Sequence, residues 1–256
     1  MGLHASLARV IAATPLAYFP VRVRKGPAKG ARWTMVPFSN NWRNGGSEQD
    51  IESALRYVSQ IEGMTFWDFG AHFGIHTVGL ALQAGPTGEV VAFEPDPVAF
   101  ARLKYHVEIN SLTNVKMCPC AASASTGTST LYFSGGAGSS CSHLKYYAEN
   151  DMSGIPSAVV QTVAPDDLVE RGQIREPNLI KVDVQGHGAQ ALAGSIKSIA
   201  RSRPVIAFSN HSPAELDGTA ELLKPLGYRP VDFSGKEVAW ANADDAVLLP
   251  KYFVTP

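Results

Sequence analysis

The chain has 256 residues, of which 45% are hydrophobic, and this is enough to fill the core of one sizeable α/β domain. Its formal net charge of -1 and its charged fraction of 18% show no global bias toward nucleic acid, so a nucleic-acid substrate is not expected. Three cysteines are too few for a disulfide framework and indicate a reducing, cytoplasmic setting. No apolar run reaches the ~18 residues that a membrane span requires, so none is predicted.

The first 60 residues are predicted to precede a Rossmann-like domain that occupies residues 61–256. Residues 5–19 are mildly apolar, but Pro15 interrupts them and Arg9 lies among them, so they favour a short docking helix over a secretory signal. Residues 21–36 alternate in polarity and are broken by glycines, which predicts a small β-meander. A helix over residues 50–61 has one apolar face and is expected to cover an edge of the main sheet.

Strands and helices then alternate along the chain. Strands ending at Phe69 and Glu94 and a strand over 115–119 are separated by helices over 75–83 and 97–111. Farther along, the pattern gives a helix over 165–171, a strand over 178–184, a helix over 189–200, a strand over 204–209, a helix over 213–226 and a closing hairpin over 228–249. This alternation is typical of a doubly wound α/β fold.

A Gly/Ser-rich segment interrupts this alternation at residues 134–140. It lies between predicted strands over 128–133 and 158–163, and its small residues cannot pack a core. Two interpretations stay open, a flexible hairpin or a lid over a substrate.

The motif W-D-F-G-A-H-F-G-I-H-T, followed by V-V-A-F-E-P, predicts a nucleotide-cofactor pocket. Gly70 and Gly74 allow a tight turn before a helix N-terminus, and Glu94, at the end of the next strand, can accept hydrogen bonds from ribose hydroxyls. His72 replaces the middle glycine of a dinucleotide motif, and Asp68 would repel a pyrophosphate. Because Asp68 suits a cofactor that carries an ammonium and a sulfonium, S-adenosyl-L-methionine is the predicted cofactor.

These motifs, together with V-R-V-R-K-G-P-A-K-G, Asn110 and L-I-K-V-D-V-Q-G-H-G-A-Q-A-L-A-G, resemble the FkbM-type family of S-adenosylmethionine-dependent methyltransferases. The resemblance covers residues 21–250. It implies a class I methyltransferase fold with a seven-stranded, mostly parallel sheet and one antiparallel strand, expected to span residues 238–249. It also implies methylation of a hydroxyl on a sugar, a polyketide or another small metabolite.

The resemblance also implies roles for individual residues. The methionine end of the cofactor would be wrapped by Asp68, Gly70, Ala71, His72 and Gly74, and Glu94 would hold the ribose hydroxyls. Pro95 and Asp96 would lie beside the adenine, with Ala121 and Ala122 as its other wall. Thr77, on the helix after the glycine turn, would assist in binding the cofactor. Ser47 and Glu48 match loosely a family position that reaches the carboxylate or amine of the methionine.

Three positions depart from the family pattern. Where an acid-rich D-V-E-G-A-E is expected, Gln185 and Gly188 stand in place of acids, and Ser209 stands where an acid usually ends the fifth strand. If one of those acids positions the substrate or deprotonates its hydroxyl, the protein has another substrate, has moved the base to a histidine, or has lost turnover.

Asp183, His187 and His211 are the candidate catalytic residues. His187 and His211 follow the fourth and fifth strands and should face the cleft, where a base that titrates near pH 7 is needed. Asp183 ends a buried strand and could hold the cofactor ammonium or a substrate hydroxyl. A metal held by His72 and His76, or by Asp183 with both histidines, is an alternative, but no metal site is assigned.

Three functions therefore stay open from the sequence. The first is an O-methyltransferase acting on a small hydroxylated acceptor. The second is an S-adenosylmethionine-binding protein without turnover, acting as a partner or sensor, in which Gln185→Glu with Gly188→Glu should create activity. The third is an NAD-dependent oxidoreductase, suggested only by the glycine turn and its acid. A homodimer is possible, and the sequence does not decide it.

Overall fold

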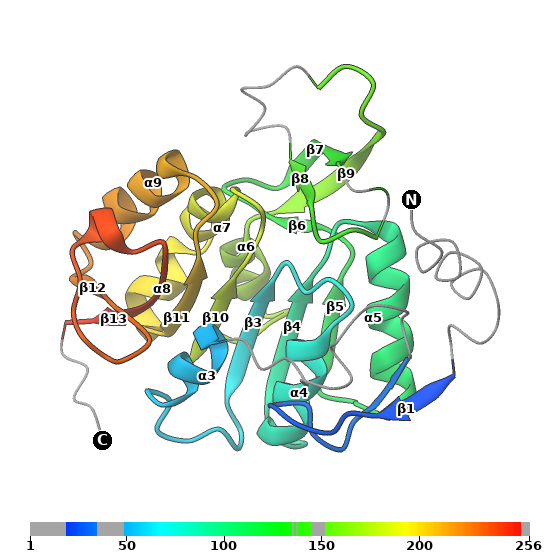
Figure 1. Cartoon of the computed structure of the whole chain (residues 1–256). Helices are drawn as coiled ribbons and strands as arrows, with labels where there is room; N and C mark the ends of the chain where they lie inside the picture. The colour runs from blue at the N-terminus through cyan, green and yellow to red at the C-terminus, as the bar shows by residue number, and fades with distance from the viewer. Residues whose placement is uncertain (1–18, 35–48, 135, 137, 145–151, 252–256) are drawn as a thin grey trace, which may run out of the picture.

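The computed structural model describes residues 19–34, 49–134, 136, 138–144 and 152–251 (Figure 1). The predicted docking helix falls almost wholly on residues 1–18, and Ser47 and Glu48 also lie outside the described residues.

A seven-stranded sheet forms the centre of the fold, in the order β12-β13-β11-β10-β3-β4-β5. β13 pairs antiparallel with both of its neighbours, whereas the pairings among β11, β10, β3, β4 and β5 are parallel. Seven strands in a mixed sheet were predicted from the sequence, but the antiparallel strand starts at Asp245 because Trp240–Asn242 forms a 3₁₀ turn, η3. The strands are β3 (Thr65–Phe69), β4 (Glu89–Phe93), β5 (Val115–Cys118), β10 (Leu179–Val182), β11 (Val205–Ser209), β12 (Tyr228–Val231) and β13 (Asp245–Pro250).

Helices cover both faces of this sheet because its central strands are apolar on both faces. On β3, Phe66 packs in one cluster with Ile51 and Leu80, while Trp67 packs in another with Leu192 and Leu216. The first cluster draws on α3 (Gln49–Leu55) and α4 (Ile75–Ala84), and the second on α7 (Gly188–Ala193), α8 (Ile196–Ser202) and α9 (Pro213–Leu223). The remaining helices are α5 (Pro97–Ile109) and α6 (Pro165–Glu170).

The single helix predicted over residues 189–200 is wrong, because the structure has two helices there. The chain breaks at Gly194 and Ser195, between α7 and α8. A Cβ at Gly194 would lie 1.9 Å from the carbonyl oxygen of Ser123, so this turn packs directly against the backbone that follows β6. The cap helix is also shorter than predicted, since α3 ends at Leu55.

A second sheet lies above the ends of the parallel strands in Figure 1, and the sequence predicted only two of its strands. Its order is β6-β9-β7-β8, with β6 (Ala121–Ala122), β7 (Gly127–Phe133), β8 (Ser142–Leu144) and β9 (Ser157–Val163). Leu131, Phe133, Leu144 and Val160 form its apolar cluster. The Gly/Ser-rich segment therefore connects two paired strands, β7 and β8.

The predicted N-terminal meander is a two-stranded hairpin of β1 (Pro20–Arg22) and β2 (Arg32–Thr34). Its Trp33 is fully buried and stacks on His106 of α5 with ring centroids 3.6 Å apart. Among the helices of the described residues, none is both long and apolar enough to cross a membrane.

Candidate active site

A cavity of about 450 Å³ opens at the carboxyl ends of the parallel strands, which is where ligands bind in open α/β sheets. The β3–α4 turn, the end of β4, the small sheet and the turn between β10 and α7 all contribute to its wall. The lining residues that the sequence predicted are Gly70, Ala71, His72, Gly74, Glu94, Pro95, Ala121, Ala122, Asp183 and His187.

The glycine turn forms one wall of the cavity through its backbone. Gly70 and Gly74 have φ values of 78° and 83°, a region that favours glycine. A Cβ at Gly70 would lie 2.0 Å from the Asp183 carbonyl oxygen, and a Cβ at Gly74 would lie 2.3 Å from Cδ1 of Leu103. Both positions therefore require glycine for space as well as for conformation.

Glu94 follows β4 and presents a buried carboxylate to the cavity. Its two oxygens accept hydrogen bonds from the backbone N–H groups of His72, at 2.7 Å, and Asp96, at 2.8 Å. Burial raises the pKa of Glu94 to about 7, although these two donors act in the opposite direction. The carboxylate is thus fixed in place and titrates near neutral pH.

His72 and Asp96 hold the Gly/Ser-rich segment against the glycine turn. Nε2 of His72 lies 3.0 Å from the Gly138 carbonyl oxygen, and the Gly138 N–H donates to Oδ2 of Asp96 at 2.7 Å. Asp96 also caps α5 through Val98 and Ala99, so its carboxylate is engaged and does not line the cavity. Ser139, Ser140, Ser142 and His143 line the cavity beyond this anchor.

Asp68 and Thr77, both predicted to contact the cofactor, lie beneath the cavity wall instead. Oδ2 of Asp68 accepts a hydrogen bond from the Thr77 hydroxyl at 2.6 Å, and neither residue is part of the cavity lining. Oδ1 of Asp68 lies 3.8 Å from Nζ of Lys181, which is buried on the adjacent strand and does line the cavity. The sequence reasoning missed Lys181, although a charged residue inside the apolar strand L-I-K-V was a usable signal.

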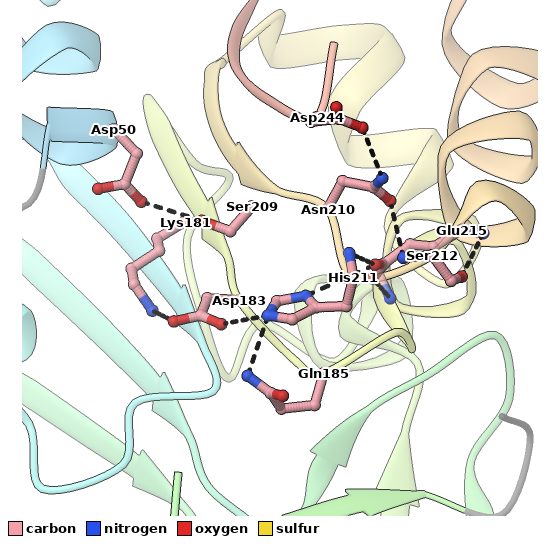
Figure 2. Close-up of polar contacts among 11 residues, drawn as sticks. Asp50, Lys181, Asp183, Gln185, Ser209, Asn210, His211, Ser212, Glu215 and Asp244 are labelled. Carbon is pink, nitrogen blue, oxygen red and sulfur yellow. Dashed lines mark hydrogen bonds and ion pairs between the residues drawn. The ribbon is translucent and has the colours of Figure 1, made fainter. Parts of the chain in front are cut away.

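Asp183 and His211 face each other at the end of β10, as Figure 2 shows. Oδ1 of Asp183 lies 3.4 Å from Nε2 of His211, and Oδ2 lies 3.3 Å from Nζ of Lys181. Burial would raise the pKa of Asp183, but Lys181 and His211 lower it overall, so the carboxylate is ionised at neutral pH. The Gln185 amide lies 2.9 Å from the same Nε2 of His211.

Glu215, which the sequence reasoning did not single out, holds His211 from the other side (Figure 2). It is fully buried near the start of α9, and Oε2 accepts a hydrogen bond from the His211 backbone N–H at 2.7 Å and lies 3.6 Å from its Nδ1. Burial lowers the pKa of His211, but Glu215 and Asp183 outweigh this effect and raise it above the usual value of 6.5. The His211 imidazole therefore lies between two carboxylates that favour its protonated form.

His187 lies apart from this pair. Its Nε2 is 3.0 Å from the hydroxyl of Ser123, and burial lowers its pKa to about 4. His187 lines the cavity, but it is neutral across the physiological range and is a weak base there. The two histidines that looked equivalent in sequence thus have opposite electrostatic surroundings.

Two of the three positions that lack a family acid lie next to an acid from another element. Gly188 donates its N–H to Oε1 of Glu215 at 2.6 Å, and a Cβ at Gly188 would lie 2.5 Å from that same oxygen. The Ser209 hydroxyl lies 3.4 Å from Oδ2 of Asp50, a residue of α3. Negative charge therefore reaches these positions from α9 and α3.

Among the described residues, no group of three or more His, Cys, Asp and Glu side chains is placed to hold a metal ion. His72 instead bonds Gly138, and His187 bonds Ser123.

Two comparisons of the sequence with known proteins give matches. A family model described as "Methyltransferase FkbM domain" matches residues 68–230. The hexuronic acid methyltransferase AglP of Haloferax volcanii is 28% identical over 171 residues, an alignment that spans 66% of this chain and 66% of that protein.

Two solved structures also align with the chain. The methyltransferase FkbM from Methylobacillus flagellatus is 20% identical with a TM-score of 0.48, over 74% of this chain and 43% of that one. Aeropyrum pernix fibrillarin, solved with S-adenosyl-L-methionine natively bound, is 12% identical with a TM-score of 0.41, over 78% of this chain and 72% of that one.

Proposed function

The chain belongs to the FkbM methyltransferase family, and from this premise we propose that it transfers the methyl group of S-adenosyl-L-methionine to a hydroxyl of a sugar or a related small metabolite. The observation that carries the proposal is one cavity with two unlike ends. At one end are the glycine turn and Glu94. At the other is an ionised Asp183, with His211 behind it, outside the cavity lining, and Nε2 of His211 3.4 Å from Oδ1 of Asp183.

The first end fits the cofactor. The whole cavity, at about 450 Å³, lies within the ~300–1,000 Å³ of small-molecule sites. Glu94 retains acceptor capacity for ribose hydroxyls, and Phe93, Pro95, Ala121 and Ala122 supply apolar surface for a base. Asp68, which was predicted to face the ammonium group, is instead engaged with Thr77 and Lys181 and does not line the cavity.

The second end fits a hydroxyl acceptor. When bound, S-adenosyl-L-methionine supplies a methyl group on a cationic sulfur. Nε2 of His211 then takes the hydroxyl proton, Glu215 orients the ring from its Nδ1 side, and Asp183 stabilises the imidazolium that forms. His211 does not line the cavity in the free protein, where the Gln185 amide lies 2.9 Å from its Nε2, so this amide must move aside before an acceptor hydroxyl can reach Nε2.

The cavity lining supports a polyhydroxylated acceptor. Ser139, Ser140, Ser142 and His143 line the side formed by the small sheet and offer donors and acceptors that suit sugar hydroxyls. The relative AglP is described as a hexuronic acid methyltransferase, which agrees with a sugar acceptor.

The test is a titration of the purified protein with S-adenosyl-L-methionine, S-adenosyl-L-homocysteine and NAD, followed by a methyl-transfer assay with uronic acids and neutral sugars. We expect micromolar binding of the first two ligands, no binding of NAD, and release of S-adenosyl-L-homocysteine with at least one sugar. Binding of NAD alone would replace the proposal with a dehydrogenase. Cofactor binding with no transfer to any hydroxylated acceptor would favour a cofactor-binding protein without turnover.

A further inference from the structure

The N-terminal hairpin carries a concentration of positive charge that the active site does not use. Between Pro20 and Thr34 the chain has five cationic side chains and no acid, although its overall formal net charge is -1. All five are exposed, and they are Arg22, Arg24, Lys25, Lys29 and Arg32. Like charges this close repel one another, so such a cluster is expected where an anionic partner binds.

The hairpin is a rigid platform. Val23, Ala28 and Trp33 are buried in a cluster that includes Val78 of α4. The amide of Asn110, which follows α5, bonds both the N–H and the carbonyl oxygen of Arg32 at 2.7 Å, and Gln83 donates to the Pro27 carbonyl oxygen at 2.9 Å. The cations are therefore held on a fixed surface.

A shallow depression of about 490 Å³ lies on this surface, lined by Arg22, Lys29 and Arg32 together with Asn110. In Figure 1 the hairpin lies beside the end of α5 that is farther from the small sheet, away from the cofactor cavity. Among the ion pairs of the described residues, none involves Arg22, Lys25, Lys29 or Arg32. Their charge is thus available to a ligand.

We propose that this basic hairpin docks the protein on an anionic lipid surface. Phe19, directly before β1, is 60% exposed, and Leu82, which lines the depression, is 43% exposed, so apolar groups accompany the charges. In the sequence, residues 1–18 before the hairpin are mostly apolar, with Arg9 and no acid. Exposed apolar side chains that enter the interface and basic side chains that attract anionic headgroups both strengthen peripheral membrane binding.

A nucleic-acid partner is less well matched by this surface. Single-stranded nucleic acid is bound by cations combined with exposed aromatic rings on which the bases stack. Among the described residues of the hairpin, Trp33 is fully buried against His106 and Phe19 is the exposed aromatic ring, so successive bases would have a single ring on which to stack.

The test is co-sedimentation of the full chain with phosphatidylcholine vesicles, with and without phosphatidylglycerol, at low and high salt. We expect binding only to the anionic vesicles, weakened by salt. The triple variant K25E/K29E/R32E should lose binding by at least on the order of 100-fold, since each basic residue near an anionic surface contributes roughly a factor of five and the new carboxylates add repulsion. Circular dichroism and cofactor titration should remain as in the wild type.

The matched control is R171E/K224E/K236E, which changes the net charge equally at exposed residues elsewhere. It should bind anionic vesicles within about threefold of the wild type, because the screened field falls off over a Debye length of roughly 10 Å. Equal loss in both variants, binding to neutral vesicles, or tighter binding to single-stranded RNA or to inorganic phosphate than to anionic vesicles would overturn the proposal.

Discussion

The two ends of the cavity are built in different ways. The end assigned to the cofactor depends on backbone geometry within a short stretch of sequence, from Gly70 to Glu94, where two glycines with positive φ form the turn. The end assigned to the acceptor is built from side chains far apart in sequence, with His211 between Asp183 and Glu215. The first end is therefore sensitive to shape, and the second is sensitive to the balance of buried charges.

Removing the His211 imidazole should have the largest effect on activity. It should leave cofactor affinity nearly unchanged, so it distinguishes the function of the acceptor end from that of the cofactor end. For His211→Gln we expect kcat to fall by roughly 100- to 10,000-fold, the usual contribution of a general base, which is about 3 to 5 kcal/mol of barrier. The affinity for S-adenosyl-L-methionine should change by less than about threefold, because the ring does not line the cavity. Steady-state kinetics and calorimetry measure the two quantities.

His187→Gln is the matched control for this prediction. Because burial lowers the pKa of His187 to about 4, this ring is already neutral in the working pH range, and its loss should leave the pH profile of kcat unchanged. If His187→Gln removed the pH dependence while His211→Gln kept it, the assignment of the base would be reversed.

Glu215→Ala should show how much of the acceptor end depends on one buried carboxylate. Its removal leaves the Gly188 and His211 N–H groups without their acceptor, so we expect the free energy of unfolding to fall by about 2 to 4 kcal/mol. The pKa of His211 should also fall, because a carboxylate that raises it is lost. Chemical denaturation measures the first effect and NMR titration of the imidazole measures the second.

Glu221→Ala, on the exposed face of the same helix, is the control and should stay within about 0.5 kcal/mol of the wild type. Gly188→Glu should destabilise the protein without adding activity, because Oε1 of Glu215 lies 2.5 Å from the position of its Cβ. A gain of activity in Gly188→Glu would instead support the view that the protein lost its turnover with that acid.

Titration of Glu94 should make the affinity for the cofactor depend on pH. With a pKa of about 7 in the free protein, the carboxylate must lose its proton to accept two ribose hydroxyls, so affinity should increase as the pH rises toward 7 and then level off. In Glu94→Gln this dependence should vanish, and binding at about pH 8 should weaken by roughly tenfold or more. Titration calorimetry across the pH range decides between these outcomes.

The free energy of unfolding of the free protein should also depend on the protonation of Glu94, but it should decrease as the pH rises. The folded state holds this proton with a pKa of about 7, against 4.5 for an ordinary Glu, so its contribution to the free energy of unfolding is fully present below pH 4.5 and is lost as the pH rises through 7. Denaturation of Glu94→Gln should lack this component. An unchanged pH slope in that variant would show that another group is responsible.

The difference between the two ends also explains what the sequence could predict. The order of strands and helices and the placement of Gly70, Gly74 and Glu94 follow from local patterns, because positive φ and an acid at a strand end are properties of a few adjacent residues. Asp68 was assigned to the cofactor by its charge and by its position in the family motif, but its partner Lys181 lies more than 100 residues away in sequence.

Glu215 was missed for a related reason. In the sequence it stands three residues after Ser212 in the first turn of a predicted helix, a position where acids are common for helix capping and the macrodipole. Its contacts to Gly188 and His211 exist only once α9 packs beside α7. Tertiary pairing of buried charges is not encoded in local spacing, so the chemistry of the acceptor end required the structure.

Gln185→Glu should have the smallest effect on activity. It nevertheless tests whether the acid absent at this position is a missing catalytic group or is replaced by acids from other elements. The Gln185 amide lies 2.9 Å from Nε2 of His211, so a carboxylate there would be the third around one imidazole and would raise its pKa further. Since the base must be unprotonated, kcat at about pH 7 should fall severalfold and recover at about pH 9, a shift of the pH profile without loss of its maximum. Gln185→Ala, which removes the amide without adding charge, should leave the profile in place. If Gln185→Glu raised kcat at every pH, the acid would be a missing catalytic group, and the charge supplied by Glu215 and Asp183 would not be its replacement.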